Sequence, residues 1–148
     1  MKITRLDHLV LTVRDIQKSC AFYTQILEME HVTFEGDRQA LIFGTQKINL
    51  HAAGHEFEPK AQYPVPGSAD LCFVTDLPVA DFVTHAQHHG VELEMGPVLR
   101  TGAIGPIESV YVRDPDGNQV EFYVDNRDYD WRRDQDWMQR PPRPIEWP

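Results

Sequence analysis

A single carboxylate, Glu121, interrupts an otherwise apolar strand near the end of the sequence. The strand is predicted over residues 119–124, and the aromatic side chain of Tyr123 lies on the same face, two residues along. A carboxylate that faces the interior of a sheet is costly unless a cation or hydrogen-bond donors compensate its charge. Either this face of the strand is solvated, or a positive group lies beside Glu121.

The strand that carries Glu121 is predicted to form a hairpin with the segment before it. Residues 109–112 and 119–124 alternate apolar and polar side chains, which is typical of β-strands. Between them, Asp114-Pro115-Asp116-Gly117 has the composition of a tight turn, in which Pro115 fixes φ and Gly117 supplies a positive φ. We expect an ordinary hairpin that presents Glu121 on its second strand.

The same order of elements is predicted twice along the chain. The first copy has a strand, a helix capped by Asp15 and three strands, at residues 7–13, 16–28, 30–35, 39–43 and 47–52. The second copy has a strand, a helix that ends at Gly90 and three strands, at residues 70–75, about 79–89, 92–95, 109–112 and 119–124. We expect an α+β fold made of two tandem βαβββ units.

One such unit leaves a face of its sheet bare, so two units are expected to form a curved mixed sheet around a cleft for a metal and a substrate. We place unit one at about residues 5–52, a linker rich in glycine and proline at 53–68, and unit two at about 69–125. Together they form one domain, residues 1–125. The sequence leaves open whether the units close on each other within one chain or across a dimer.

Aligning the two copies predicts which side chains share the cleft. His8 at the start of the first copy pairs with Asp70, and Asn49 near its end pairs with Glu121. All four face the expected cleft, where a metal ion could be held. Asp70 could instead only cap the turn before it.

Composition limits the classes of partner. The chain has 148 residues, of which 41% are hydrophobic and 25% charged, which is typical of a globular domain with its own core. The net charge of −9 and the lack of a basic cluster argue against nucleic acids and anionic membranes. Apolar runs are too short for a membrane span or a secretion signal, and the two cysteines lack CxxC spacing. We expect a cytoplasmic protein with a small-molecule substrate and no nucleic-acid or membrane partner.

The last residues have a different composition. Residues 126–148 contain Trp131, Trp137 and Trp147 and end in a proline-rich segment. Leaving three indoles in water is costly. We expect this C-terminal extension to pack on the domain or on a second subunit.

Three segments carry a resemblance to a known family. DHLVLTV, AFYTQILEME and RDPDGNQVEF, placed in two βαβββ units, resemble the vicinal oxygen chelate superfamily, which includes glyoxalase I, extradiol ring-cleaving dioxygenases and bleomycin resistance proteins. The resemblance covers about residues 5–125. It implies one divalent metal ion (Ni, Mn, Zn or Fe), no organic cofactor and a homodimer.

The resemblance also implies metal ligands, position by position. Family members typically have a histidine at the position of His8 and a glutamate at that of Glu121, and both match. Many lyases of the family have Glu or Gln where this chain has Asn49, and most metal-binding members have His where it has Asp70. Asp70 can still bind a metal through oxygen. Alternatively His51, two residues beyond Asn49 on the same face, supplies a second imidazole.

The resemblance implies three functions. The first is a glyoxalase-like lyase or isomerase, in which a metal held by His8, Asp70 and Glu121 chelates vicinal oxygens of the substrate and Glu121 moves a proton. The second is an Fe(II) extradiol dioxygenase, whose two histidines and one carboxylate would require His51. The third is a non-catalytic small-molecule binding protein of the resistance type.

Other side chains are predicted to contact the substrate or to remain on the surface. The glycine-rich loop 100–106 is expected to cover the cleft, so that Arg100 or Arg113 pairs with an anionic group of the substrate; alternatively both are surface arginines. Asn49 and Tyr123 are expected to line the substrate site. Cys72 shares the face of Asp70 and is expected to be a small buried residue; alternatively it lines the cleft. His85, His88 and His89 are expected to be exposed to solvent; alternatively the i, i+4 pair among them binds a zinc ion.

Overall fold

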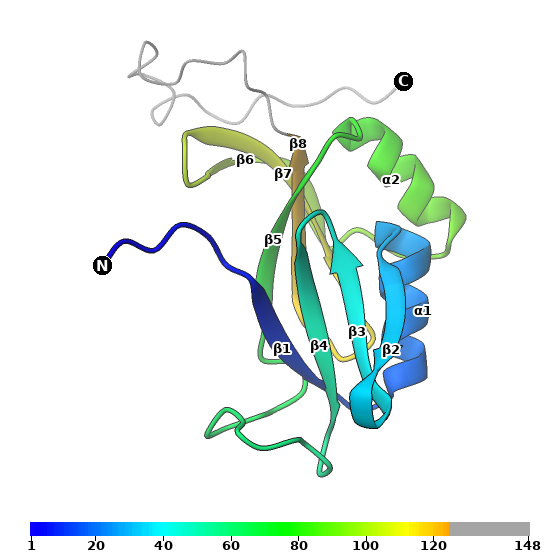
Figure 1. The fold of residues 1–148 in the computed structure, drawn as a ribbon. Coiled ribbons are helices and arrows are strands. Elements are labelled where there is room, and N and C mark those ends of the chain that lie inside the picture. The colour runs from blue at the N-terminus through cyan, green and yellow to red at the C-terminus, as the bar shows by residue number, and fades with distance from the viewer. Residues whose placement is uncertain (125–148) are drawn as a thin grey trace. The chain divides into compact units, whose positions relative to one another are not determined.

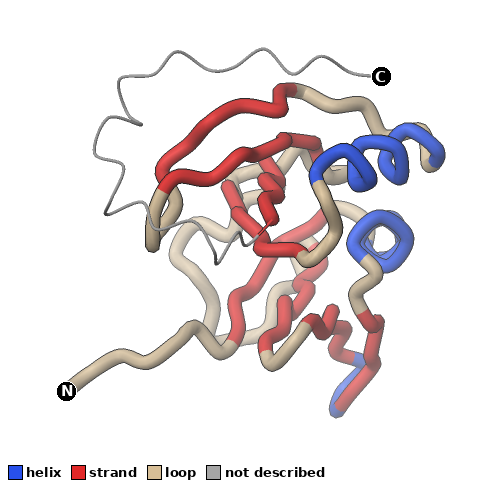
Figure 2. Tube along the Cα trace, turned by 90° about the horizontal axis from the view of Figure 1, so that it is seen from above, coloured by secondary structure: helices blue, strands red, loops and turns tan. Residues whose placement is uncertain are grey.

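The computed structural model describes residues 1–124, which fold into two βαβββ units (Figure 1). The first sheet has the strand order β1-β4-β3-β2 and the second β5-β8-β7-β6. Each unit contains one α-helix beside its strands (Figure 2). The predicted α+β fold with two tandem βαβββ units is therefore confirmed. The predicted extension, residues 126–148, lies outside the described residues.

The elements follow the predicted order. Those of the first half are β1 (His8–Val13), α1 (Ile16–Leu27), β2 (Glu30–Phe34), the short 3-10 helix η1 (Glu35–Asp37), β3 (Arg38–Phe43) and β4 (Gln46–Ala52). Those of the second half are β5 (Asp70–Thr75), α2 (Val79–His88), β6 (Met95–Thr101), β7 (Pro106–Arg113) and β8 (Gln119–Val124). No helix within residues 1–124 is long and apolar enough to span a membrane.

The chain divides into two compact units. Unit 1 comprises residues 1–69 and the turn at 114–119, and unit 2 comprises residues 70–113 with the described residues from Val120 onward. In unit 1, α1 contacts β2, β3 and β4, and the core contains the fully buried side chains Tyr23, Leu41, Ile48 and Leu50. In unit 2, Phe122 packs against Phe82 of α2 and stacks on Phe73 of β5, with ring centroids 4.3 and 6.0 Å away.

Local signals place the ends of both helices. Asp15 caps α1 as predicted, since its carboxylate accepts a hydrogen bond of 3.1 Å from the backbone N–H of Lys18. Gly90 follows α2 with φ of 72°, in the left-handed region that glycine adopts without strain. The start of α1 and the end of α2 therefore follow from local sequence signals, whereas no side chain caps the start of α2 at Pro78.

Equivalent hydrogen bonds support the predicted alignment of the two copies. The N–H of Lys47 donates to the carbonyl of Asp7, and the N–H of Gln119 donates to the carbonyl of Ala69. Asp7 and Ala69 immediately precede His8 and Asp70, whereas Lys47 and Gln119 stand two residues before Asn49 and Glu121. His8 is therefore structurally equivalent to Asp70, and Asn49 to Glu121, in the two copies of the repeat.

The second copy departs from prediction at β6. We predicted a strand at residues 92–95 followed by a long loop, but β6 runs over Met95–Thr101 and pairs with β7, leaving only residues 102–105 between them. The pairing shifts register at Gly96, where a Cβ atom would lie 2.6 Å from the carbonyl oxygen of Ser109. Glycine and proline here mark a β-bulge rather than a loop. The loop predicted at residues 100–106 is therefore shortened to residues 102–105, and Arg100 lies on β6.

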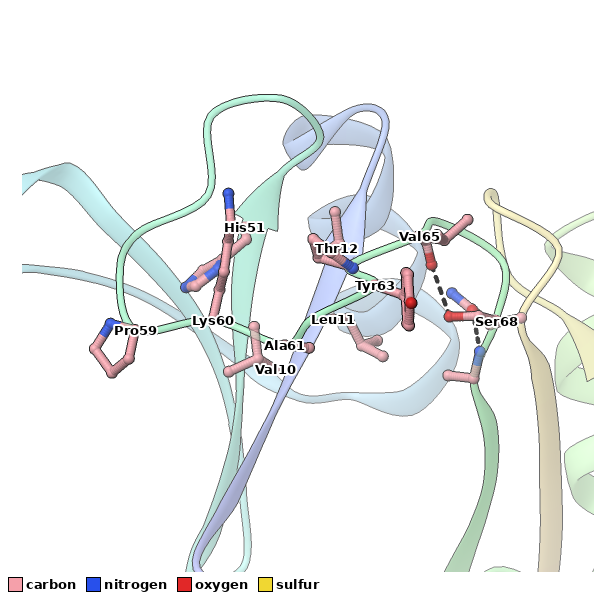
Figure 3. A pocket seen from close by; sticks show the side chains of 13 residues that line it. Val10, Leu11, Thr12, His51, Pro59, Lys60, Ala61, Tyr63, Val65 and Ser68 are labelled. Carbon is pink, nitrogen blue, oxygen red and sulfur yellow. Dashed lines mark hydrogen bonds between the residues drawn. The ribbon is translucent and has the colours of Figure 1, made fainter.

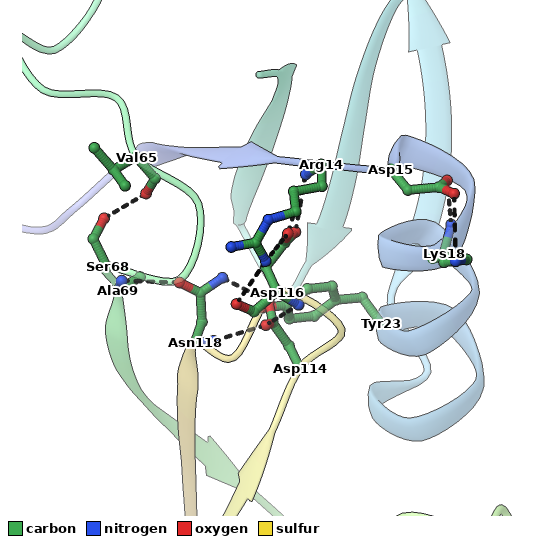
Figure 4. Close-up of polar contacts among 10 residues, drawn as sticks. All are labelled: Arg14, Asp15, Lys18, Tyr23, Val65, Ser68, Ala69, Asp114, Asp116 and Asn118. Carbon is green, nitrogen blue, oxygen red and sulfur yellow. Dashed lines mark hydrogen bonds and ion pairs between the residues drawn. The ribbon is translucent and has the colours of Figure 1, made fainter. Parts of the chain in front are cut away.

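The turn at 114–119 is a buried polar cluster rather than an ordinary connection (Figure 4). Oδ1 of Asp114 accepts the N–H groups of Asp116 and Asn118, both at 2.9 Å. Its Oδ2 accepts the hydroxyl of Tyr23 at 3.0 Å and the side-chain amide of Asn118 at 2.7 Å. Asp116 in turn accepts the N–H of Arg14 at 3.1 Å. Gly117 has the predicted positive φ, 86°, but the role of the acidic residues was not predicted.

Candidate functional site

Glu121 lies half-buried on β8 in unit 2, and one of its oxygens lacks a partner. Its Oε1 atom is buried and accepts no hydrogen bond from any described residue. Cys72 and Tyr111 flank the carboxyl group, since the pKa of each is raised in part by Glu121. A buried carboxyl oxygen without a donor costs about 1–3 kcal/mol. A cation or a donor from a bound molecule would compensate this oxygen.

Arg100 extends the polar cluster around Glu121. Its Nε atom donates to the hydroxyl of Tyr111 at 3.0 Å, and its guanidinium lies 5.5 Å from the centroid of the same ring. Burial, followed by the interaction with Glu121, raises the pKa of Tyr111, whereas Arg100 lowers it. Arg100 and Glu121 were predicted site residues, but Tyr111 was missed. Its alternation with Val110 and Val112 was the available signal, because it places the ring on the opposite face of β7 from those core residues.

The remaining predicted residues of unit 2 lie close to charged partners. Arg113 donates to both carboxylate oxygens of Glu94, at 2.7 Å for Nη2, and this arginine lowers the pKa of Glu94. Asp70 is exposed at the start of β5, and its charge contributes to the raised pKa of Arg113. Tyr123 lies half-buried on β8, two residues from Glu121 on the same face.

Cys72 differs from its predicted buried role. The residue is exposed on β5, at the position between Asp70 and Val74 on the same face. Partial burial of the thiol, and then the Glu121 carboxylate, raise its pKa to about 12. Cys72 is therefore a protonated thiol at neutral pH, since the carboxylate beside it disfavours a second negative charge.

His8 lies exposed at the start of β1 in unit 1. Its Nδ1 atom is 2.8 Å from Oδ1 of Asp7, a carboxylate–histidine pair of the kind that orients the imidazole in metal sites. Asn49 pairs with Val10 of β1 and lies half-buried, and its Oδ1 atom is buried without a partner among the described residues. At the position equivalent to Glu121, unit 1 thus also has an unoccupied buried oxygen acceptor.

His51 lies apart from His8 along the sheet. In the parallel pairing of β1 with β4, His8 is opposite Lys47 and His51 is opposite Thr12. The two histidines are thus offset by four strand positions, roughly 13 Å at about 3.3 Å per residue. His51 is 9% exposed, its ring contacts Phe57 edge-on at 5.4 Å, and its Nδ1 atom has no partner among the described residues.

The burial of His51 predicts a pH dependence of stability. Burial, and then the charge of Arg38, lower the pKa of His51 below the ordinary histidine value of 6.5. Because the unfolded chain binds the proton more readily, the free energy of unfolding is expected to fall as the pH drops below about 6.5. Urea unfolding between pH 5 and 7.5 should show this slope, and His51→Gln should reduce it. An unchanged slope in the variant would assign the dependence to other groups.

A pocket of about 350 Å³ opens in unit 1 beside His51 (Figure 3). It is lined by Val10, Leu11, Thr12, His51, Pro59, Lys60, Ala61, Tyr63, Pro64, Val65, Ser68, Ala69 and Asn118. Strands β1 and β4 supply one side of it, and residues 59–69 supply the other. The segment predicted to be only a linker therefore forms a wall of a pocket, which its glycine and proline content did not reveal.

Comparison with known proteins supports the family indicated by these features. Residues 5–122 match the model of the Glyoxalase/Bleomycin resistance protein/Dioxygenase superfamily. The chain belongs to this superfamily. The predicted resemblance, which rested on both βαβββ units and the hairpin that carries Glu121, is thereby confirmed.

Several superfamily members resemble this chain over most of its length. Virulence protein STM3117 of Salmonella typhimurium is 56% identical over 122 residues, which cover 82% of this chain and 85% of that protein. Glyoxalase domain-containing protein RDO1 of Mycosarcoma maydis is 55% identical over 122 residues, which cover 82% of this chain and 69% of that protein. The structure of an integron cassette protein from V. cholerae has a TM-score of 0.83 and 55% identity, covering 85% of this chain and 98% of its own.

The metal ion implied by the superfamily fits some of the residues present. Glu121 offers a buried oxygen that has no donor, and His8 has an imidazole whose other nitrogen is held by Asp7. His8 belongs to unit 1, whereas Asp70 and Glu121 belong to unit 2. Neither unit by itself, within residues 1–124, gathers three His, Cys, Asp or Glu side chains into a metal-binding group.

The histidines of α2 form a separate cluster in this superfamily member. The rings of His85 and His89 are 4.4 Å apart, and those of His88 and His89 are 5.5 Å apart. His88 and His89 are exposed as predicted, whereas His85 is half-buried. Nδ1 of His89 lies 2.9 Å from the carbonyl oxygen of His85, so one ring nitrogen of the cluster is already engaged by the backbone.

Proposed function

We propose that this chain is a metal-dependent enzyme of the glyoxalase type, a lyase or isomerase that acts on a small oxygenated molecule. The observation that carries the proposal is the buried Oε1 atom of Glu121, which has no donor among the described residues. Proteins retain such costly groups mainly where a ligand compensates them. A divalent metal ion is the compensation that the family membership suggests.

In this proposal His8, Asp70 and Glu121 hold one divalent metal ion. One imidazole nitrogen and carboxylate oxygens suit Mn, Fe, Ni or Zn. When bound, the metal would act as a Lewis acid toward two neighbouring oxygens of the substrate. The Asp7 carboxylate would fix the orientation of the His8 ring and increase its basicity.

The protein side chains around Glu121 would orient the substrate and move its proton. Glu121 is the proposed general base, since a carboxylate can remove a proton from a carbon next to a carbonyl group. Tyr111 keeps its proton because its pKa is raised, so its hydroxyl can donate to a substrate oxygen. Arg100 is the better candidate for an anionic group of the substrate, because Arg113 is already paired with Glu94. Asn49 and Tyr123 would complete the substrate site.

The two other candidate functions fare differently. An extradiol dioxygenase needs a second histidine ligand, and the offset of four strand positions between His8 and His51 disfavours that arrangement. A non-catalytic binding protein is favoured by the preformed pocket of unit 1, which contains none of the proposed metal ligands. The binding function is therefore the second candidate.

Metal content separates these functions. Tag-free protein purified without chelators is expected to contain nearly stoichiometric metal by mass spectrometry, and His8→Ala and Glu121→Ala are expected to contain more than about tenfold less. His31→Ala is the matched control, because His31 is an exposed histidine on β2. Nickel, manganese or zinc would support the lyase, and iron the dioxygenase. If the protein stays metal-free after incubation with excess Mn, Fe, Ni or Zn, both metal-dependent functions would be contradicted. The non-catalytic binding function would then be the supported one.

A further inference from the structure

We propose that the pocket of unit 1 is a second binding site, for a small uncharged molecule with an apolar body and one hydroxyl group. The pocket lies between β1 and the segment 59–69, and His51 lines it (Figure 3). None of His8, Asp70 and Glu121 contributes to its lining. The pocket is therefore built from residues other than the three proposed metal ligands.

The size and the apolar lining indicate the body of the ligand. A volume of about 350 Å³ falls at the lower end of the range for small-molecule pockets, about 300–1,000 Å³. Three lining side chains, Val10, Tyr63 and Val65, remain 45%, 78% and 56% exposed although they are large and apolar. Apolar side chains that gather around a concave surface are typical of ligand sites. A single aromatic ring fits within this volume.

His51 indicates the polar group of the ligand. It is nine-tenths buried, and its Nδ1 atom is buried without a hydrogen-bond partner among the described residues. A neutral imidazole has one donor and one acceptor nitrogen, and a hydroxyl group can satisfy either. A ligand hydroxyl would therefore compensate the unsatisfied ring of His51.

The charges at the rim of the pocket favour an uncharged ligand. The ammonium group of Lys60 is paired with Glu56 at 3.1 Å and with Glu58 at 3.5 Å. The guanidinium of Arg38, the other cation near His51, lies over the ring of Phe57 at 4.6 Å. Because the carboxylates already compensate Lys60, the pocket has no free charge to bind an anion strongly.

The wall of the pocket is fixed before any ligand binds. The hydroxyl of Ser68 donates to the carbonyl of Val65 at 2.7 Å, and the N–H of Ala69 donates to Oδ1 of Asn118 at 2.9 Å. At Gly67 a Cβ atom would lie 2.6 Å from the carbonyl oxygen of Asp116, so this segment packs closely on the buried turn. A preformed wall lowers the entropic cost of binding.

Three probes that differ in one group test the proposal. We would titrate p-cresol, toluene and 4-methylbenzoate into the full-length protein and follow backbone amide shifts by NMR. We expect p-cresol to shift the amides of Val10, Thr12 and Ser68 saturably, with a dissociation constant on the order of 1 mM. Toluene and 4-methylbenzoate should bind at least about fivefold more weakly, because each lacks the hydroxyl group.

Two variants separate the roles of His51 and of the cavity. His51→Phe removes the ring nitrogens, so p-cresol should lose about fivefold in affinity while toluene is unchanged. Ala61→Trp adds an indole at an exposed lining position and should block both ligands without disturbing the core. His8→Ala should leave binding of p-cresol unchanged, so failure of the metal proposal would not affect this test.

Clear outcomes would overturn the inference. Absence of saturable shifts in the lining residues with all three probes would show that the pocket binds no ligand of this class. If p-cresol bound the wild type and His51→Phe with equal affinity, the proposed hydrogen bond between the ligand hydroxyl and His51 would be disproved. Stronger binding of 4-methylbenzoate than of p-cresol would show that the site prefers anions.

Discussion

Glu121→Gln is expected to lower metal affinity at least about 100-fold and to abolish turnover, while raising the free energy of unfolding of the metal-free protein by about 1 kcal/mol. The substitution keeps the size of the side chain and removes its charge. A buried carboxylate whose Oε1 atom lacks a donor destabilises the protein that has no bound cation. Stability and function therefore conflict at this residue, as they often do at binding sites.

Glu108→Gln is the matched control for this experiment. Glu108 is an exposed glutamate on β7 of the same unit, so the same chemical change should alter stability by less than about 0.5 kcal/mol. Metal affinity would be measured by competition with a chromophoric chelator, and stability by urea unfolding of the metal-free variants. Unchanged metal affinity in Glu121→Gln would remove Glu121 from the ligand set. Loss of stability in the metal-free variant would show that the carboxylate is satisfied in the folded protein.

Asp114→Ala is expected to be the most destabilising substitution in unit 1, by about 3–5 kcal/mol. The carboxylate accepts four hydrogen bonds, at 2.7 to 3.0 Å, from Tyr23, Asp116 and Asn118. Its removal leaves several buried donors without an acceptor, and each such donor costs about 1–3 kcal/mol unless the turn relaxes. The same turn holds the N–H of Arg14 through Asp116.

Two further variants calibrate this prediction. Tyr23→Phe removes one of the four donors and should cost only about 1 kcal/mol. Pro115→Ala changes an exposed residue of the same turn and should cost less than Asp114→Ala. All three would be compared by urea unfolding at pH 7. A loss below about 1 kcal/mol for Asp114→Ala would show that the cluster rearranges around the missing carboxylate.

The predicted family and fold are confirmed, whereas the site residues and the metal ligands stay a prediction. The family match and the two βαβββ units support the choice of His8 and Glu121, since these positions are equivalent in register to Asp70 and Asn49. The metal, the proton transfer and the dimer are proposals for experiment.

The sequence by itself determined the order of the elements and the position of Glu121. Alternation with a period of two, helical spacing, the Asp15 cap and the glycines at positions 90 and 117 are local signals, and each depends on a few neighbouring residues. Because the same order of strands and helix is predicted in both halves of the chain, the fold class could be predicted from the sequence pattern. The bulge at Gly96 was mistaken for a loop because glycine and proline favour both.

Only the tertiary structure decided which side chains surround the predicted residues. Tyr111 reaches Glu121 through the pairing of β7 with β8, and Arg100 reaches Tyr111 through the pairing of β6 with β7. Strand register is set by long-range packing. Burial of Asp114 depends on Tyr23, which is 91 residues away in the sequence. The pocket likewise forms because segment 59–69 returns to β1 and β4, a contact that no local pattern encodes.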